Sequence, residues 1–134
     1  MSLMKVFNIS GSAVSAQSQR LNVVASNLAN AESVAGPDGQ TYKARQVVFQ
    51  STPTQDGGAG VRVSTIAEDN SPAKRVFEPG HPMADQTGHI TQSNVNVVEE
   101  MVNMISASRS YQNNVEVMNT ARSLLQKTLQ MGQS

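Results

Sequence analysis

The chain has 134 residues with ten acidic and ten basic side chains, so its formal net charge is zero when the histidines are neutral. This balance disfavours a nucleic-acid-binding protein, which needs a basic surface, and the length suits one domain with a modest core. Cysteine and tryptophan are absent and aromatic residues make up 4% of the chain, which excludes disulfides and thiolate chemistry and argues against a large independent core.

The first predicted element is a helix over residues 3–31, which would be about 40 Å long at about 1.5 Å per residue. Its apolar residues recur at every seventh position, and small or apolar residues follow the first three of them by four: Phe7, Val14, Leu21 and Leu28, then Gly11, Ser18 and Ala25. This thin heptad seam is typical of a helix that lies close to a helical partner. Taken by themselves, Asn27 and Asn30 look like residues that fray the end of this helix.

The composition changes sharply over residues 33–94, which hold all five prolines and seven of the nine glycines. Three runs rich in strand-forming residues predict short strands over residues 42–50, 61–66 and 75–77. Glycine and proline predict turns at residues 36–39 and 79–82, and a glycine-rich stretch at 55–60 predicts a mobile loop between the first two strands. We expect this insert to project from the helices.

The last predicted element is a helix over residues 94–129, about 50 Å long and free of proline. Its apolar side chains alternate at steps of four and three, interrupted at Ser108 and Arg122: Val97, Met101, Met104, Tyr111, Val115, Met118, Leu125 and Leu129. This rhythm indicates a coiled-coil stripe, and so long a helix in so short a chain needs a partner along its length. Asn96 is the expected N-cap, with Glu99 able to reach back to it, and Gly132 marks the expected end.

These elements predict an α+β fold in which long N- and C-terminal helices form a coiled-coil-like pair, with a small β-rich insert between them. The expected segments are residues 1–32, 33–94 and 95–134. The N-terminus does not resemble a secretory signal, because polar and small residues interrupt any apolar core near Ser10. No stretch approaches the apolar length that spans a bilayer.

Three polar residues have a spacing that invites a metal site. His81, Asp85 and His89 are four residues apart, which suits one face of a helix, but Pro82 and Gly88 argue against a helix there. A metal site needs convergent ligands with supporting contacts, so a structural loop is the favoured interpretation.

Two other patterns have simpler structural explanations than chemical ones. Glu99 and Glu100 are adjacent near a helix start, where capping explains them better than acid–base catalysis does. The Gly-Gly-Ala-Gly stretch at residues 57–60 lacks the Lys-Ser/Thr of a phosphate-binding loop. The seven methionines are interpreted as core and seam fillers. We therefore assign no catalytic, cofactor-binding or metal-binding residue.

Both ends of the chain carry motifs that match a known family. Residues 19–33, Gln-Arg-Leu-Asn-Val-Val-Ala-Ser-Asn-Leu-Ala-Asn-Ala-Glu-Ser, resemble the N-terminal motif of the flagellar axial proteins of the rod and hook. Residues 93–119 resemble the C-terminal motif of that family. The stretch Phe-Glu-Pro-Gly-His-Pro at residues 77–82 is similar to the proximal rod proteins of the basal body.

The resemblance implies a core of paired terminal helices packed in a helical tube, within the basal-body rod in the periplasmic space. It also implies export through the flagellar type III apparatus without signal cleavage. The implied partners are further copies of the chain, other rod subunits and the export apparatus. Neither nucleic acid nor direct membrane insertion is expected.

The resemblance also bears on individual residues. Arg109, Tyr111 and Asn114 match the family's Arg-x-Tyr-x-x-Asn motif, although by themselves they would suit a solvated helix face or a register-setting position. Asn27 and Asn30, within the N-terminal motif, look like interface residues. The candidate assembly-interface residues are Leu21, Asn27, Leu28, Asn30, Met101, Met104, Arg109, Tyr111, Asn114, Val115, Met118, Leu125 and Leu129.

We therefore expect a structural subunit of the proximal rod that polymerises through its terminal helices into the torque-transmitting shaft, with no enzymatic activity and no cofactor. The alternative is a coiled-coil adaptor or secreted effector that binds a partner helix. Such a protein would need the C-terminal stripe but not the Asn-Leu-Ala-Asn segment at residues 27–30.

Overall fold

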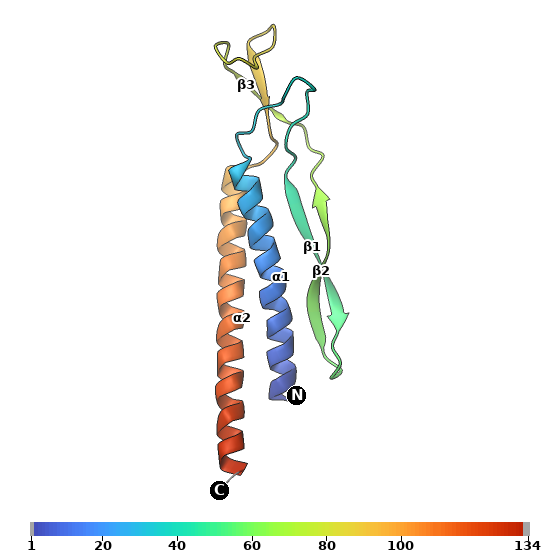
Figure 1. The fold of residues 1–134 in the computed structure, drawn as a ribbon, viewed down its shortest axis with the longest axis vertical. Coiled ribbons are helices and arrows are strands. Elements are labelled where there is room, and N and C mark those ends of the chain that lie inside the picture. The colour runs from blue at the N-terminus through green and yellow to red at the C-terminus, as the bar shows by residue number, and fades with distance from the viewer. Residues whose placement is uncertain (1, 133–134) are drawn as a thin grey trace.

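Two long helices and two small β-hairpins make up the fold (Figure 1). The computed structural model describes residues 2–132; Met1, Gln133 and Ser134, at the ends of the predicted segments 1–32 and 95–134, lie outside the described residues. The elements in chain order are α1 (Leu3–Ala29), β1 (Arg45–Pro53), β2 (Ala59–Glu68), β3 (Lys74–Phe77), β4 (His89–Gln92) and α2 (Val97–Gly132). The predicted α+β class, with terminal helices around a small insert, is confirmed.

The helices begin at side-chain caps. The Ser2 hydroxyl accepts a hydrogen bond from the Lys5 N–H at 3.1 Å, and the Asn96 side-chain oxygen accepts one from the Glu99 N–H at 3.2 Å. Each cap satisfies one of the amide groups that a helix start leaves without a partner. The predicted cap at Asn96 is therefore confirmed. Neither helix, as described, is both long and apolar enough to cross a membrane.

Two alanines and a glutamate are the buried residues on the face of α2 that contacts α1. Glu100, Ala107 and Ala121 are buried at intervals of seven and fourteen residues, so they lie on one side of the helix. The alanines allow the two helix backbones to approach closely. The predicted stripe overlaps this face without coinciding with it, because its members Met101 and Met104 are exposed. The buried face is thus offset from the predicted stripe, which it shares in part.

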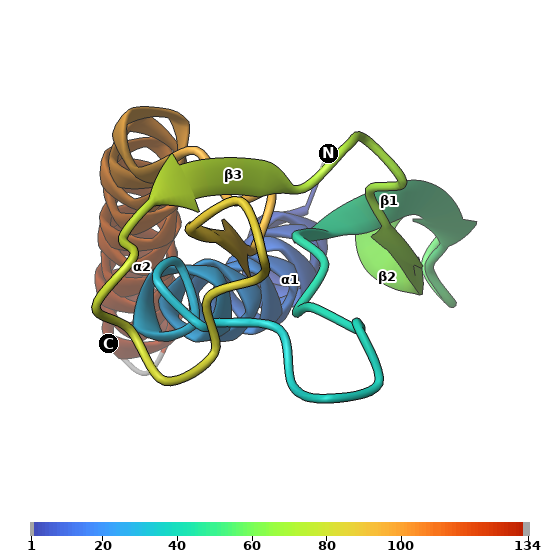
Figure 2. The ribbon, with the colours of Figure 1, turned by 90° about the horizontal axis from the view of Figure 1, so that it is seen from above.

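Helix α1 forms the middle layer, between α2 and the β1–β2 hairpin (Figure 2). The heptad residues Phe7, Val14, Leu21 and Leu28 are half-buried, but the predicted close-approach residues Ser18 and Ala25 are exposed. The buried residues are instead Ser10, Ala16, Val24 and Asn27. A helix covered on two sides buries a wider set of positions than a two-helix seam does, which explains the difference.

The β1–β2 hairpin lies along α1 (Figure 1). The prediction that the insert projects from the helices is therefore wrong for this hairpin. Its antiparallel register runs from Arg45 opposite Glu68 to Pro53 opposite Ala59, with an irregularity between Val48 and Phe49. The Val61 N–H donates to the Ser12 hydroxyl of α1 at 3.1 Å. A two-stranded hairpin is marginally stable by itself, and packing against a helix removes this weakness.

The connection between β1 and β2 is shorter than predicted, because the strands extend to Pro53 and Ala59. The Thr54 N–H donates to the Gly58 carbonyl at 2.9 Å, and the Gly58 N–H donates to the Thr54 hydroxyl at 3.0 Å. The turn therefore has its own hydrogen bonds. Gly58 also lies against Ile9 and Lys5 of α1.

The buried Gly60 of the β1–β2 hairpin lies close to α1. A Cβ atom at this position would lie 2.7 Å from the Ser12 hydroxyl oxygen, which is held by its own hydrogen bond to the Ile9 carbonyl. We expect Gly60→Ala to lower the free energy of unfolding by about 1–3 kcal/mol, as overpacking does. Gly80→Ala is the matched control, because a Cβ there meets nothing within 4 Å. Equal urea midpoints for the two variants would contradict this close approach.

The second hairpin was only partly predicted. Strand β3 pairs antiparallel with β4, from Lys74 opposite Gln92 to Phe77 opposite His89. The prediction contained β3 but not β4, whose Ile90 is almost fully buried. The predicted turns are present: the Gly39 N–H donates to the Gly36 carbonyl, and the His81 N–H donates to the Glu78 carbonyl.

A small core lies where the helices meet the insert. Its members are Ala31, Ala44 and Val95, with Tyr42 and Val97 packed against them. Polar contacts close this junction as well. The buried Ser93 hydroxyl donates to the Ala31 carbonyl at 2.8 Å, and the Asn94 side chain accepts from the Ala44 N–H and donates to the Asp69 and Ser71 carbonyls.

Candidate assembly interface

Asn27 is fully buried, at 0% exposure, where α1, β1 and α2 meet. Its side-chain oxygen accepts from the Tyr42 hydroxyl at 2.8 Å and from the Arg45 N–H at 3.0 Å. Its amide nitrogen donates to the Arg45 carbonyl at 2.8 Å and to the Glu100 carboxylate at 3.1 Å. These four bonds use the full capacity of an asparagine side chain. Asn27 therefore joins three segments of its own chain, and in this conformation it presents no surface to a neighbouring subunit.

Glu100 is a buried carboxylate at the edge of a groove. The groove has a volume of about 460 Å³ and runs between α1, α2 and β1. Its lining includes the cationic side chains of Arg20 and Arg45 and the apolar side chains of Val47 and Phe49. The Arg20 guanidinium donates to the Asn103 side chain at 3.5 Å, so it ties α1 to α2 across the groove.

The other candidates on α1 lie close to the same junction. Leu21 and Leu28 are half-buried within the chain. Asn30 donates from its amide to the Ser26 carbonyl at 2.9 Å and accepts from the Ser33 hydroxyl at 3.1 Å. This geometry ends α1 and turns the chain toward the insert, which gives Asn30 a local structural role.

The candidates on α2 divide into two groups. Half-buried within the chain are Tyr111, Asn114, Val115, Met118 and Leu125; exposed are Met101, Met104, Arg109 and Leu129. The Asn114 amide donates to the Ser110 carbonyl at 2.8 Å, one turn earlier in the same helix. The first group contributes to the intramolecular helix pair, and the second is available to other chains.

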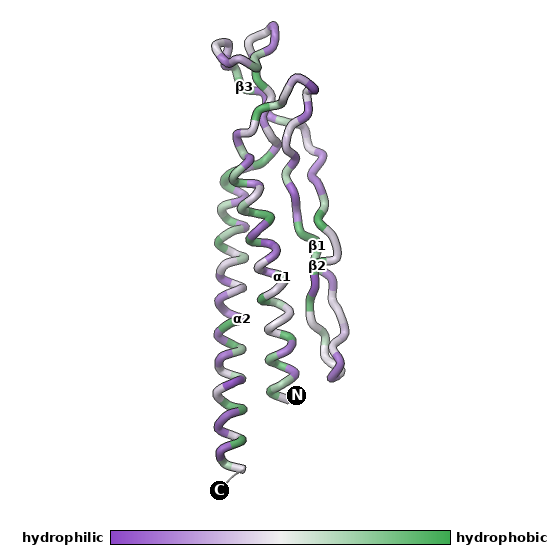
Figure 3. Tube along the Cα trace, in the orientation of Figure 1, coloured by the Kyte–Doolittle hydropathy of each residue, from purple (hydrophilic) through white to green (hydrophobic). Residues whose placement is uncertain are grey.

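The start of α2 carries an exposed aliphatic surface on the side away from α1. Val98 and Ala107 are nine residues apart, about two and a half turns, which places them on opposite sides of the helix. Val98 is 70% exposed and Val102 is 60% exposed, and Ile105 is exposed beside them. In Figure 3 much of the trace at the first turns of α2 has the green colour of hydrophobic residues. A monomeric protein rarely leaves several large aliphatic side chains together in water without a partner for them.

The opposite end of α2 extends beyond the start of α1 (Figure 1). Leu3, Met4 and Phe7 line an apolar pocket of about 140 Å³ together with Ala121, Arg122 and Leu125. Past this pocket α1 no longer covers α2, and Leu129 is 60% exposed. Both ends of the helix pair thus expose apolar surface.

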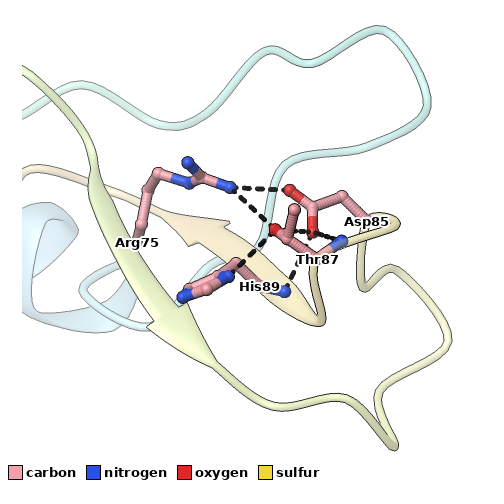
Figure 4. A network of polar contacts seen from close by, with 4 residues as sticks. All are labelled: Arg75, Asp85, Thr87 and His89. Carbon is pink, nitrogen blue, oxygen red and sulfur yellow. Dashed lines mark hydrogen bonds and ion pairs between the residues drawn. The ribbon is translucent and has the colours of Figure 1, made fainter.

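A polar network closes the β3–β4 hairpin (Figure 4). One oxygen of Asp85 accepts from the Thr87 hydroxyl at 2.6 Å, the Thr87 N–H at 2.9 Å and the His89 N–H at 3.0 Å. The other oxygen pairs with the Arg75 guanidinium at 2.7 Å. The Thr87 hydroxyl and the N–H groups of His89 and Thr87, together with the Arg75 charge, hold the pKa of the Asp85 carboxyl well below its usual range.

The lowered pKa of Asp85 determines how the stability of the β3–β4 hairpin depends on pH. A carboxyl with a lowered pKa stabilises the hairpin above its unfolded pKa of about 3.9, and this stabilisation is lost as the pH falls through the lower folded value. We expect the Thr87 and His89 amide signals in NMR spectra to titrate only well below pH 3.9, and this titration to be absent in Asp85→Asn. Glu78→Gln is the control in the same hairpin. A midpoint at the ordinary aspartate pKa would contradict the network.

The residues considered for a metal site are used in local contacts. Asp85 is engaged as described, and the His81 ring nitrogen Nδ1 accepts from the Met83 N–H at 3.0 Å. Over residues 2–132, no group of three or more histidine, cysteine, aspartate or glutamate side chains is placed to hold a metal ion.

Comparisons with known proteins address the family directly. A family model described as "Flagella basal body rod protein" matches residues 7–37, and one described as "Flagellar basal body rod FlgEFG protein C-terminal" matches residues 86–131. The chain is 62% identical to the flagellar basal-body rod protein FlgC of Yersinia enterocolitica over 135 aligned residues, which cover 99% of this chain and 100% of that protein. The chain belongs to the FlgC family of flagellar basal-body rod proteins.

Other relatives extend the FlgC match. The FlgC protein of Salmonella typhimurium is 58% identical over 99% of this chain and 100% of its own length. The FlgC protein of Buchnera aphidicola from Schizaphis graminum is 48% identical over the same shares. The resemblance that the two terminal motifs and residues 77–82 indicated is therefore confirmed over nearly the whole chain.

The FlgC-family chain contains structural residues that the sequence reasoning did not single out. Tyr42 and Arg45 bind Asn27, and Asn94 binds backbone groups of three residues at the junction. Glu100, interpreted from the sequence as a capping residue, instead accepts a hydrogen bond from the Asn27 amide. The one available signal was the position of Asn27 inside a helix, because asparagine favours caps and turns and needs a specific reason to lie in a helix.

Proposed function

We propose that this chain is a structural subunit of the flagellar basal-body rod that polymerises through its terminal helices. The observation that carries the proposal is the match to FlgC rod proteins along 99% of the chain, on a fold that consists mainly of a helix pair. The alternative, a coiled-coil adaptor or secreted effector, has no comparable support. We assign the chain no enzymatic activity and no cofactor.

The exposed surfaces at both ends of the helix pair support polymerisation. A contact between two different surfaces does not close on itself and therefore builds an open helical tube. The aliphatic start of α2 and the apolar pocket at the start of α1 are two such surfaces. In a tube that transmits torque, the total buried interface matters more than any single contact.

The remaining parts of the proposal concern location and partners. We propose that the chain reaches the periplasmic part of the basal body through the flagellar export apparatus without signal cleavage. There it would contact copies of itself and other rod subunits. The resemblance to the axial proteins supports this route, and neither nucleic acid nor direct membrane insertion has a place in it.

Gene deletion followed by electron microscopy of isolated basal bodies tests the proposal. The expected result is a membrane ring without a rod, and rods and swimming restored by a plasmid copy of the gene. Intact mass spectrometry of the chain in restored basal bodies should find the N-terminal segment retained. Complete rods in the deletion strain would refute the structural role.

A further inference from the structure

The loop that joins β3 to β4 forms, together with the last residue of β3, a projecting tip (Figure 1). We call residues 77–83 the hairpin tip. Phe77 is 64% exposed, more than either of the other two phenylalanines, and Glu78 is exposed beside it. Among residues 2–132, no hydrogen bond or ion pair engages the Glu78 carboxylate. The tip therefore presents an apolar surface and a negative charge that its own chain does not use.

Contacts on both sides hold the hairpin tip in place. The Glu78 N–H donates to the Gly88 carbonyl at 2.9 Å, and the His81 N–H donates to the Glu78 carbonyl at 3.1 Å. The Phe77 ring packs edge-on against the His89 ring, with 5.2 Å between the ring centroids. Its edge also lies so close to Gly88 that a Cβ atom there would be 2.8 Å away. An aromatic side chain that is already ordered loses little freedom on binding, and aromatic residues often anchor protein interfaces.

The groove between α1, α2 and β1 has complementary properties. Its lining includes Phe49, which is 37% exposed, and the guanidinium groups of Arg20 and Arg45. In the part of the chain that the structure describes, neither arginine forms an ion pair, although Glu68 lies opposite Arg45 in the strand register. Glu100 contributes one negative charge, so the groove stays positive overall. Unpaired guanidinium groups beside apolar side chains favour a ligand that is both acidic and apolar.

We propose that the hairpin tip of one copy of this chain docks into the groove of a second copy in the rod. Phe77 then packs against Val47 and Phe49, and the Glu78 carboxylate pairs with the Arg45 guanidinium. The groove volume of about 460 Å³ lies within the range of about 300–1,000 Å³ that is typical of ligand clefts, so it can receive these two side chains. The tip and the groove are different surfaces, so their contact does not close on itself and can continue from copy to copy.

The positions of the two arginines favour Arg45 as the partner of the tip. Asn27 fixes the Arg45 backbone through hydrogen bonds to its N–H and its carbonyl, while the Arg45 side chain stays exposed. Arg20, in contrast, already donates to Asn103 across the groove. An anchored backbone with an available guanidinium suits recognition of an incoming carboxylate.

A second copy is required because one chain cannot make this contact itself. Strands β1 and β3 do not touch, and the hairpin tip lies beyond the start of α2, whereas the groove lies beside the first turns of that helix (Figure 1). The second copy must therefore be displaced along the helix axis. Other exposed acidic residues with apolar neighbours, such as Glu99 and Glu116, lie on α2. A helix is about 10 Å thick, which is too bulky for this groove.

This contact deepens the proposed role as a rod subunit and rests on it. The groove exists only where α1, α2 and β1 have packed together. The contact therefore forms in the assembled rod and requires no structure of the free chain.

The absence of cysteine allows the contact to be tested in rods that assemble in cells. Pro79 is exposed in the hairpin tip, and Gln46 is exposed in the groove lining. We expect a chain with both Pro79→Cys and Gln46→Cys to give disulfide-linked dimers and larger multimers in oxidised basal bodies, and neither single variant to do so. Pro79→Cys combined with Thr65→Cys is the matched control, because Thr65 is exposed on β2 outside the groove lining. Complete rods without linked chains would overturn the proposal.

Charge reversal gives a second, independent readout. Glu78→Arg alone and Arg45→Glu alone should each lower the linked fraction about tenfold, because each places like charges together. The two reversals combined should return it to within about threefold of the original, as a compensating pair does. Glu78→Gln, which removes the charge without repulsion, should have a smaller effect. Swimming of the same strains should follow the same order. If the combined reversal recovers neither linkage nor swimming, the pairing is refuted.

A photo-reactive amino acid in place of Phe77 decides between a second copy and another subunit. Mass spectrometry of the adducts from basal bodies should find the β1 segment of this same protein. Adducts to a different rod protein alone would overturn the copy-to-copy contact. That outcome leaves the proposed rod function intact, which the gene deletion tests separately.

Discussion

Asn27→Ala is expected to lower the free energy of unfolding by about 3 kcal/mol or more. The substitution removes four hydrogen bonds at once and leaves the Arg45 backbone groups and the Glu100 carboxylate without this partner, while the Tyr42 hydroxyl keeps its contact with Ser26. Each buried polar group left unsatisfied costs about 1–3 kcal/mol, and a charged one costs more. Urea unfolding followed by far-ultraviolet circular dichroism measures the loss.

Asn22→Ala is the matched control, because Asn22 is exposed on the same helix. Alanine is the better helix former, so this control should be neutral or slightly stabilising. Asn27→Asp keeps the size and the acceptor oxygen but loses both donated bonds and brings two carboxylates together at Glu100. It should be at least as damaging as alanine. Equal unfolding midpoints for Asn27→Ala and Asn22→Ala would show that the four hydrogen bonds of Asn27 contribute little to stability.

Ala107→Asp is expected to separate the two helices and abolish swimming. Ala107 is 0% exposed on the face of α2 that contacts α1, so an aspartate there would have to be buried. Burying an unpaired carboxylate costs several kcal/mol, which is comparable to the whole stability of a small domain. Urea unfolding and a swimming assay in the deletion strain measure the two effects.

Ser106→Asp is the control for the same charge one position away, because Ser106 is exposed on α2. It should leave the unfolding midpoint within about 0.5 kcal/mol of the original value, as surface substitutions do. If Ser106→Asp were as damaging as Ala107→Asp, the contact face of α2 would have to be placed elsewhere.

The helices could be predicted because each carries its own signals. A heptad rhythm, an N-cap at Asn96 and the absence of proline are local features that need no tertiary information. The exact contact face of α2 could not be predicted in the same way. The stripe was traced through the large apolar residues, such as Met101 and Met104, whereas the structure buries Ala107 and Ala121. Two helices that approach closely need small side chains between them. A search for periodic large apolar residues does not find such positions.

The position of the β1–β2 hairpin depends on tertiary contacts that cannot be predicted from the local sequence. Strand patterns indicated β1 and β2, but their packing along α1 rests on Gly60 lying against Ser12 and on Asn27 reaching Arg45. Strand β4 is only four residues long and contains one large aliphatic residue, Ile90. Its local sequence therefore does not predict that it forms a strand paired with β3. Such pairings are decided by tertiary context.

The assembly interface stays a prediction that rests on motifs and residue types. Exposed aliphatic residues at the start of α2 agree with a helix that needs a partner, but Asn27 turned out to serve its own chain. A polar residue in a family motif can be required for folding or for assembly, and residue type alone does not separate the two roles.

The contacts of Asn27 also determine when the chain can fold. They join residue 27 to residues 42 and 45 and then to residue 100, and α1 and α2 pack against each other along opposite ends of the sequence. A nascent chain still attached to the ribosome lacks part or all of α2, so the face of α1 that contacts α2 stays uncovered until synthesis is nearly complete. Contacts of such long sequence separation also form slowly. The newly made protein therefore passes through a period in which the helix pair has not yet formed.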